Sequence, residues 1–129
     1  MDNQVQPKNA FRLEGKVIRK STLQGGQNAN TGREWYKLEI VLAMVSAKHN
    51  KTYYYPVHFW GNVAIKTSEK VNMNDYISVE GQVVTKEYRN SRTNEVDYFI
   101  NLNGYGVEVL QKADANEPAF EEEFIDVPF

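Results

Sequence analysis

The stretch from Lys51 to Gly61 carries the side chains best suited to chemistry, and it reads Lys-Thr-Tyr-Tyr-Tyr-Pro-Val-His-Phe-Trp-Gly. Its aromatic and β-favouring residues, closed by a glycine, predict a strand that ends in a turn. Alternation along this strand places Tyr54, His58 and Trp60 on one face. The opposite face would then pack the core, through Tyr55, Val57 and Phe59. Flat rings beside a histidine and a lysine suit stacking on a flat ligand and attraction to an anion.

Catalytic chemistry is poorly supported by the rest of the sequence. His49 and His58 have no Ser, Cys and acid pattern around them that would indicate a nucleophile. A metal-dependent hydrolase is the alternative suggested by Glu121, Glu122, Glu123 and Asp126, but adjacent carboxylates on a flexible peptide lack the fixed geometry of a metal centre. We therefore expect a protein that is not an enzyme, with no metal and no cofactor.

Composition narrows the class of protein further. A chain of 129 residues is most simply a single domain, long enough to bury a hydrophobic core. The absence of cysteine excludes disulfides and thiolate metal sites. No apolar run approaches the roughly 20 residues of a membrane span, and the polar Met1–Ala10 does not resemble a signal peptide. We expect a soluble cytoplasmic protein.

The net charge of −2 conceals an asymmetry along the chain. Six of the 17 acidic side chains lie in residues 114–129, which contain no Lys or Arg, so the preceding part of the chain carries about +4. A mildly basic body can bind a polyanion, and an acidic tail is unsuited to that task.

Periodicity predicts strands separated by turns and one helix. The expected helix is Asn62–Lys70, with Asn62 as its N-cap, and the polar stretch Gln24–Gly32 is either a ligand-contacting arm or a solvated connection. The last strand is expected to be interrupted at Gly104 and Gly106. The expected strands are Phe11–Lys20, Arg33–Ala47, Lys51–Gly61, Asp75–Tyr88 and Asp97–Leu110.

Two similar pentapeptides, Leu13-Glu-Gly-Lys-Val17 and Val79-Glu-Gly-Gln-Val83, place a glycine inside a strand. Such glycines indicate sharp bends in a small curled barrel. Three strands, a short helix and two more strands is the order of a five-stranded OB-type barrel, although other small barrels and α+β folds share it. The fold class predicted is all-β, a five-stranded OB-fold barrel with one short helix and a disordered acidic C-terminal tail.

Several of these motifs resemble those of bacterial and phage single-stranded DNA-binding proteins. The similarity covers His58-Phe-Trp-Gly61, Val79–Tyr88, Asp97-Tyr-Phe-Ile100 and the terminal Asp-Val-Pro-Phe129. The family's usual Asp-Pro-Glu after the first strand is missing, and the linker Gln111–Phe120 is short. These departures imply a divergent, compact member of phage or mobile-element type.

The resemblance implies roles for particular side chains. Tyr54 and Tyr88 match positions of stacking tryptophans in that family, and Trp60 matches a phenylalanine. The predicted base-stacking residues are these three rings and Trp35, which alternation places on the face of Lys37. Packing in the core or a subunit interface is the alternative for Trp35 and Trp60, and the favoured reading for Tyr53 and Tyr55. The predicted phosphate contacts, some of which are expected to be ordinary surface, are Lys16, Arg19, Lys20, Arg33, Lys37, Lys51, Lys86, Arg89 and Arg92.

The acidic tail with its apolar tip implies a docking peptide for partner enzymes, formed by Phe124, Ile125, Asp126, Val127, Pro128 and Phe129. We expect a flexible lead (1–10), a single-stranded-DNA-binding domain (11–110), and a linker with docking tail (111–129). The expected function is to coat and protect single-stranded DNA without sequence preference in replication, recombination and repair. For the oligomeric state, a homotetramer is favoured over a dimer. The expected location is the cytoplasm of a bacterial host, in association with the nucleoid. The alternative function is an OB-fold RNA-binding protein or a primosome-type adaptor.

Overall fold

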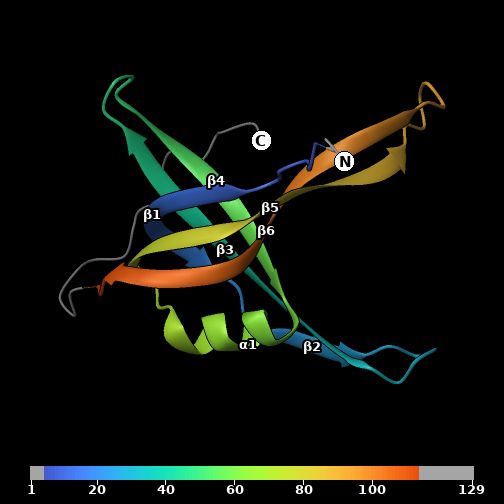
Figure 1. Cartoon of the computed structure of the whole chain (residues 1–129), viewed down its shortest axis with the longest axis horizontal. Helices are drawn as coiled ribbons and strands as arrows, with labels where there is room; N and C mark the ends of the chain where they lie inside the picture. The colour runs from blue at the N-terminus through green and yellow to red at the C-terminus, as the bar shows by residue number, and fades with distance from the viewer. Residues whose placement is uncertain (1–4, 114–129) are drawn as a thin grey trace.

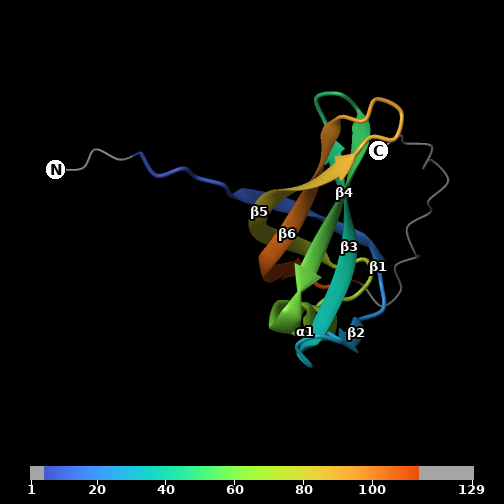
Figure 2. The same cartoon turned by 90° about the vertical axis from the view of Figure 1, so that its right-hand side faces the viewer.

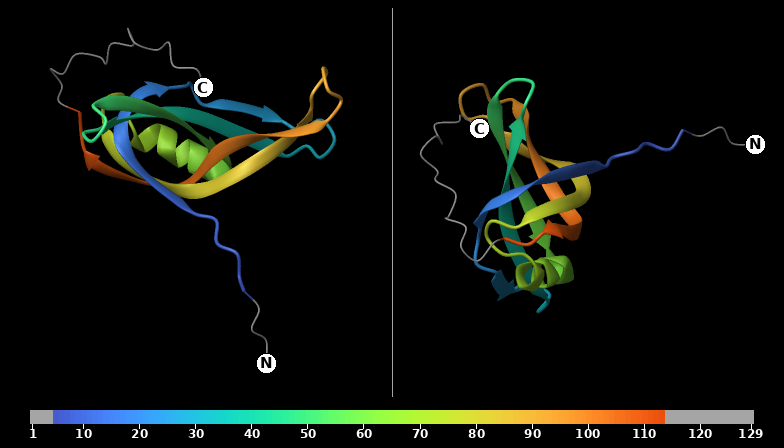
Figure 3. Two further views of the ribbon diagram at one scale, coloured as in Figure 1. Left: turned by 90° about the horizontal axis from the view of Figure 1, so that it is seen from above. Right: turned by 90° about the vertical axis from the view of Figure 1, so that its left-hand side faces the viewer.

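Five strands of this protein close into a barrel. The computed structural model describes residues 5–113, and its sheet has the order β1-β5-β6-β4-β3-β2, with an additional β1–β3 pairing that closes the ring. Figure 3 shows the strands encircling the core with α1 across one opening. The elements are β1 (Phe11–Lys20), β2 (Gln24–Gln27), β3 (Glu34–Ser46), β4 (Lys51–Trp60), α1 (Gly61–Lys70), β5 (Tyr76–Arg89) and β6 (Val96–Gln111). The predicted five-stranded barrel with one helix is confirmed, and β2 lies outside the ring.

Strand β1 closes the barrel by changing partner along its length. Its first half pairs with β5 from Phe11 to Lys16, and its second half pairs with β3 from Lys16 to Lys20. A Cβ on Gly15 would lie 2.8 Å from the Ala43 carbonyl oxygen, so only glycine lets the two strands approach this closely. Gly15 therefore lies next to Lys16, where β1 passes from β5 to β3, and its lack of a side chain permits the close packing there.

The core follows the predicted alternation of β3 and β4. Val57 and Phe59 are fully buried as expected, whereas Tyr55 is only partly buried. Strand β3 supplies three core side chains because alternate residues of a strand share a face. The buried cluster consists of Val17, Leu38, Ile40, Leu42, Val57, Phe59, Ala64, Val71, Ile77 and Val79.

Helix α1 begins one residue earlier than predicted. Trp60 occupies the N-cap position and makes no side-chain capping hydrogen bond, so the prediction of Asn62 as N-cap is wrong. Gly61 has a φ of +62°, a conformation that glycine adopts easily and that turns the chain directly from β4 into the helix. At the other end, Lys20 Nζ donates hydrogen bonds to the carbonyl oxygens of Ser68 (2.6 Å) and Val71 (2.7 Å).

Two predicted irregular segments are more regular in the structure. The first half of the predicted loop Gln24–Gly32 is strand β2, which pairs with Glu34–Lys37 to form a two-stranded ribbon, hereafter the β2–β3 arm. Strand β6 runs unbroken through Gly104 and Gly106, because a shift in register between Glu80 and Gly81 absorbs the irregularity. The predicted loop and the predicted interruption were therefore wrong at these points.

A second ribbon, the β5–β6 arm, comprises residues 84–101 of the two longest strands. Figure 1 shows this arm and the β2–β3 arm projecting from the same side of the barrel, above and below the end of β4. Viewed from that side, β3 and β4 run down between the two arms (Figure 2). The surface formed by the ends of β3 and β4 therefore lies between two projecting ribbons, the β5–β6 arm at one end and the β2–β3 arm at the other.

The two ends of the chain lie partly outside the described residues. Of the predicted flexible N-terminal segment, residues 1–10, the structure describes residues 5–10. There the Asn9 side chain makes two hydrogen bonds with the backbone of Val83: Oδ1 accepts from Val83 N (2.9 Å), and Nδ2 donates to Val83 O (2.6 Å). The predicted disordered tail, residues 114–129, is not described. Across residues 5–113, no helix has the length and apolar character required to cross a membrane.

Candidate nucleic-acid interface

A groove of about 450 Å³ lies between the β3–β4 pair and the β5–β6 arm. It arises because β4 and β6 pair in parallel over only three residues, Val57–Phe59 with Leu102–Gly104, beyond which the arm diverges from β4. The walls combine an aromatic ring, two lysines, a histidine and two amides. The lining residues are Lys37, His58, Trp60, Val84, Thr85, Lys86, Asn101 and Asn103.

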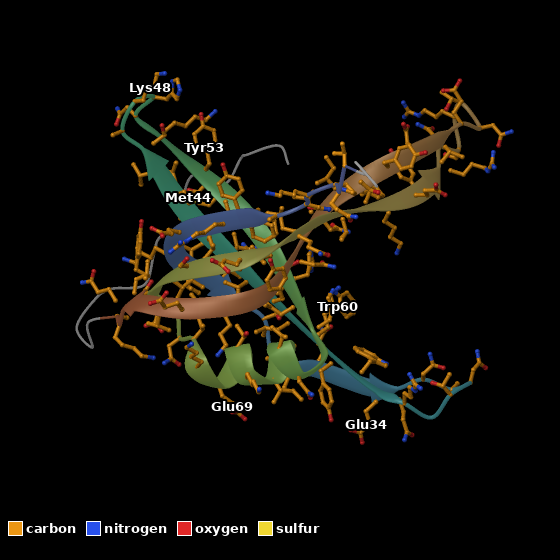
Figure 4. All side chains as sticks on the ribbon, viewed as in Figure 1. Glu34, Met44, Lys48, Tyr53, Trp60 and Glu69 are labelled. Carbon is orange, nitrogen blue, oxygen red and sulfur yellow. The ribbon has the colours of Figure 1, made fainter. Side chains whose placement is uncertain are left out.

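Trp60 and Lys37 form one end of this groove. They lie directly opposite each other across β3 and β4, and Lys37 Nζ sits 5.1 Å from the centroid of the Trp60 ring. The ring is 48% exposed, so an ammonium group and an open aromatic surface adjoin. Figure 4 shows Trp60 at the end of β4, on the side where the arms project. The predicted common face of Trp60 and His58 agrees with the structure, in which both side chains line this groove.

His58 is the next groove residue along β4, directly opposite Glu39. Its Nδ1 lies 3.6 Å from Glu39 Oε2, and it has no hydrogen-bond partner among the described residues. Partial burial lowers the pKa of the imidazole; the Glu39 carboxylate opposes this shift and the Lys37 ammonium reinforces it. Proton binding to His58 is therefore disfavoured in the folded protein.

The β5–β6 arm continues the groove with a pair of stacked rings. Tyr88 and Phe99 have ring centroids 4.2 Å apart at an interplanar angle of 19°. Phe99 lies opposite Lys86, so the stacked rings and the groove lysine occupy one face of the arm. Phe99 is 54% exposed and was missed in the sequence analysis. Its pairing with Lys86 in the predicted hairpin was the signal that would have identified it.

The other two predicted stacking residues differ in exposure. Trp35 is 42% exposed on the β2–β3 arm, where it shares the face of Lys37. Tyr54 has the same parity as Trp60, yet it is only 7% exposed and clusters with Ile18, Val41 and Ala43. Stacking by Tyr54 stays a prediction, and it requires the ring to be uncovered first.

Some predicted phosphate contacts lie in or next to the groove. Lys37 and Lys86 line it. Arg89 lies at the far end of the β5–β6 arm, where its Nη1 donates to the Asn94 carbonyl oxygen at 2.9 Å. Arg92 is exposed in the turn of the same arm, and Arg33 is exposed in the turn of the β2–β3 arm. These cations extend along the side of the molecule that carries the exposed rings.

The remaining predicted cations lie elsewhere. Lys16 lines a separate depression of about 160 Å³ with Tyr76 and Lys112. Lys20 is held by carbonyl oxygens at the end of α1, and Arg19 is exposed on β1. Lys51 Nζ sits 5.4 Å from the Tyr53 ring near the tip of the β3–β4 hairpin. The structure therefore does not gather the nine predicted cations into one site.

The acidic side chains of the described residues do not gather into one cluster. Residues 5–113 contain no cluster of three His, Asp or Glu side chains placed to hold a metal ion. The carboxyl group of Asp75 is buried, which by itself would raise its pKa. Hydrogen bonds donated by Ala113 N and Asn72 N, together with the nearby Lys112 ammonium, outweigh this effect and lower the pKa of Asp75. The predicted docking residues 124–129 and the carboxylates of residues 121–126 lie outside the described part of the chain.

Comparison with known proteins identifies the fold. No family model matches the sequence, and no curated protein does. Solved structures do match, among them the crystal structure of the SSB domain of a Synechococcus sp. protein, with a TM-score of 0.53 and 19% identity. The match covers 81% of this chain and 98% of that one. The similarity establishes the OB fold predicted from the sequence.

Proposed function

We propose that this protein binds single-stranded DNA without sequence preference, and thereby coats and protects it during replication, recombination and repair. The observation that carries the proposal is the groove, which places the half-exposed Trp60 ring beside Lys37 and Lys86. Rings stack on any base and lysines neutralise phosphates, so the combination suits a single strand of any sequence. The structural similarity to an SSB domain supports the same function.

The strand would follow the groove onto the β5–β6 arm. One base stacks on Trp60, and a later base stacks on the Tyr88–Phe99 pair, each contributing roughly 1 to 3 kcal/mol. Lys37 and Lys86 contact the phosphates between these platforms. A duplex offers no exposed base faces, which is why the site favours a single strand.

The other parts of the chain complete this proposal. Residues 11–110 form the DNA-binding domain, and residues 111–129 supply a linker and a docking peptide for replication, recombination and repair proteins. Several barrels in a homotetramer would raise avidity for a long strand. The protein would act in the cytoplasm of a bacterial host, at its nucleoid, and would have no catalytic activity.

Binding of three matched ligands tests the central proposal. Labelled oligo-dT, the same length of oligo-U and a duplex of equal length are titrated at fixed salt, and anisotropy reports the dissociation constants. We expect the tightest binding to the single-stranded DNA. Equal affinity for duplex would refute the proposal, and tighter binding of oligo-U would favour the RNA-binding alternative.

The docking role needs its own test, because it concerns a different part of the chain. Deletion of residues 125–129, or Phe129→Ala, should abolish capture of replication and repair proteins from a bacterial lysate. Affinity for oligo-dT should be unchanged or slightly higher, since the tail carries negative charge. Capture of the same partners by the truncated protein would contradict the docking role.

A further inference from the structure

The β2–β3 arm carries an aromatic ring laid across a glycine. Gly26 and Trp35 are paired directly across the two strands. A Cβ added to Gly26 would lie 2.9 Å from both Cε2 and Cζ2 of the Trp35 ring. The ring therefore occupies the space above Gly26 that any other side chain would fill.

The neighbouring pair repeats this arrangement on the opposite face. Gly25 is paired with Tyr36, and a Cβ added to Gly25 would lie 3.0 Å from Tyr36 Cδ1. Successive residues of a strand point to opposite faces, so the two rings cover the two sides of the ribbon. The Tyr36 side leads toward the barrel core, whereas the Trp35 side continues the face that carries Lys37.

One face of the Trp35 ring is consequently supported by β2, and the opposite face is accessible to a ligand. One side of its indole rests on the β2 backbone at Gly26, and 42% of the residue remains exposed. A ring that is already held in place loses little conformational freedom when a ligand stacks on it. Lys37, two residues along β3 on the same face, links this ring to Trp60 in the groove.

We infer that Trp35 is a separate base-stacking platform on the β2–β3 arm and that Gly26 is its positioning residue. The inference rests on the proposed function and deepens it, because it extends the binding site beyond the groove. A strand long enough to fill the groove from Trp60 to the Tyr88–Phe99 pair continues past Lys37 and places its remaining bases at Trp35. Gly26 acts through the ring and does not contact the ligand.

Gly26→Ala is a clean test of this arrangement. The positive-φ glycines among residues 5–113 are Gly32 and Gly61, so the backbone at Gly26 accepts alanine and the substitution displaces only the ring. Gly25→Ala is the matched control, since it disturbs Tyr36 on the other face by a similar amount. Trp35→Ala removes the platform without adding any atom, and it keeps the test decisive should Gly26→Ala unfold.

The experiment compares short and long oligo-dT, of about 4 and about 14 nucleotides, which lie near the lower and upper ends of the usual range of site sizes for such barrels. For the long oligomer, we expect Trp35→Ala to weaken binding by at least about 5-fold and Gly26→Ala by at least about 3-fold. Gly25→Ala should match the wild type, and all variants should bind the short oligomer equally. In a Trp60→Phe background, the remaining Trp35 fluorescence should be quenched by the long oligomer only.

The outcomes separate this inference from the proposed function. If the wild-type protein binds neither oligomer, the proposed function fails. If the wild type binds both and the folded Trp35→Ala and Gly26→Ala variants bind the long oligomer equally well, the platform is wrong while the groove stands. Equal losses for Gly25→Ala and Gly26→Ala would likewise overturn the positioning role, because a general disturbance of the arm would then explain both.

Discussion

Replacing Trp60 by alanine should weaken binding of single-stranded DNA while leaving the barrel folded. Stacking of one base on an aromatic side chain contributes roughly 1 to 3 kcal/mol, which corresponds to a rise in Kd of about 5-fold to 150-fold. We expect a loss in the middle of this range, because Trp60 is 48% exposed and offers part of its ring to a base.

The cost to folding can be set beside this effect. A buried tryptophan removes up to about 250 Å² from water, so burying half of one contributes about 2 to 3 kcal/mol at 25 cal/mol per Å². Trp60 occupies the N-cap position of α1 without a side-chain cap, so alanine removes no capping hydrogen bond. A domain with a stability of 5 to 15 kcal/mol remains folded after such a loss.

Fluorescence anisotropy with labelled oligo-dT measures the Kd, and thermal unfolding checks the fold. Trp60→Phe should retain much of the affinity, since it keeps a flat ring. Tyr105→Ala is the control for loss of an exposed ring, because Tyr105 is exposed on β6 but does not line the groove. A folded Trp60→Ala protein with wild-type Kd would refute the assignment of this groove as the binding site.

Three further effects follow from the same structure. The logarithm of the affinity should fall linearly with the logarithm of the salt concentration, and Lys86→Gln should reduce the slope by about 0.7, whereas Lys48→Gln, in the turn between β3 and β4 (Figure 4), should not. Burial lowers the pKa of His58, so the imidazole takes up a proton more readily in the unfolded chain than in the folded protein as the pH falls below about 6.5. The free energy of unfolding should therefore decrease toward pH 5, and it should decrease less in His58→Gln. An equal decrease in both proteins would show that His58 is not responsible. Lys20→Met should lower the free energy of unfolding by about 2 to 3 kcal/mol in urea denaturation, with no change in DNA affinity and little effect from the control Lys66→Met.

The barrel was predictable because its strands alternate clearly. Leu38, Ile40 and Leu42 lie two residues apart and are fully buried in the core cluster, whereas Glu39 and Val41 between them are outside that cluster; this period of two identifies the strand and its core face. Strand β2 carries no such signal, because Gln-Gly-Gly-Gln is exposed throughout and has no apolar face. It becomes a strand through its partner, whose aromatic rings cover its two glycines. Cross-strand packing of this kind is invisible to local periodicity.

The site was predictable only in part, because parity assigns a face but not an exposure. Tyr54 and Trp60 share a face of β4, yet the first is nearly buried and the second half exposed. Phe99 was overlooked because an aromatic run gives no indication of which ring points to the groove until the hairpin register is known. Lys20 resembles any basic surface residue in the sequence, and its role depends on where the carbonyl oxygens of α1 fall.

The double pairing of β1 has a consequence for the order in which the chain folds. The pairs Phe11–Gly81 and Lys16–Tyr76 join residues far apart in sequence, whereas β3 with β4 and β5 with β6 are local hairpins. Closing a long loop costs more entropy than forming a hairpin, so ring closure by β1 is expected late. During synthesis on the ribosome, β1 emerges first, and its first half cannot pair until β5 has been made. During that interval the half of β1 destined for β5 has an open edge, which is the kind of edge through which incomplete chains associate.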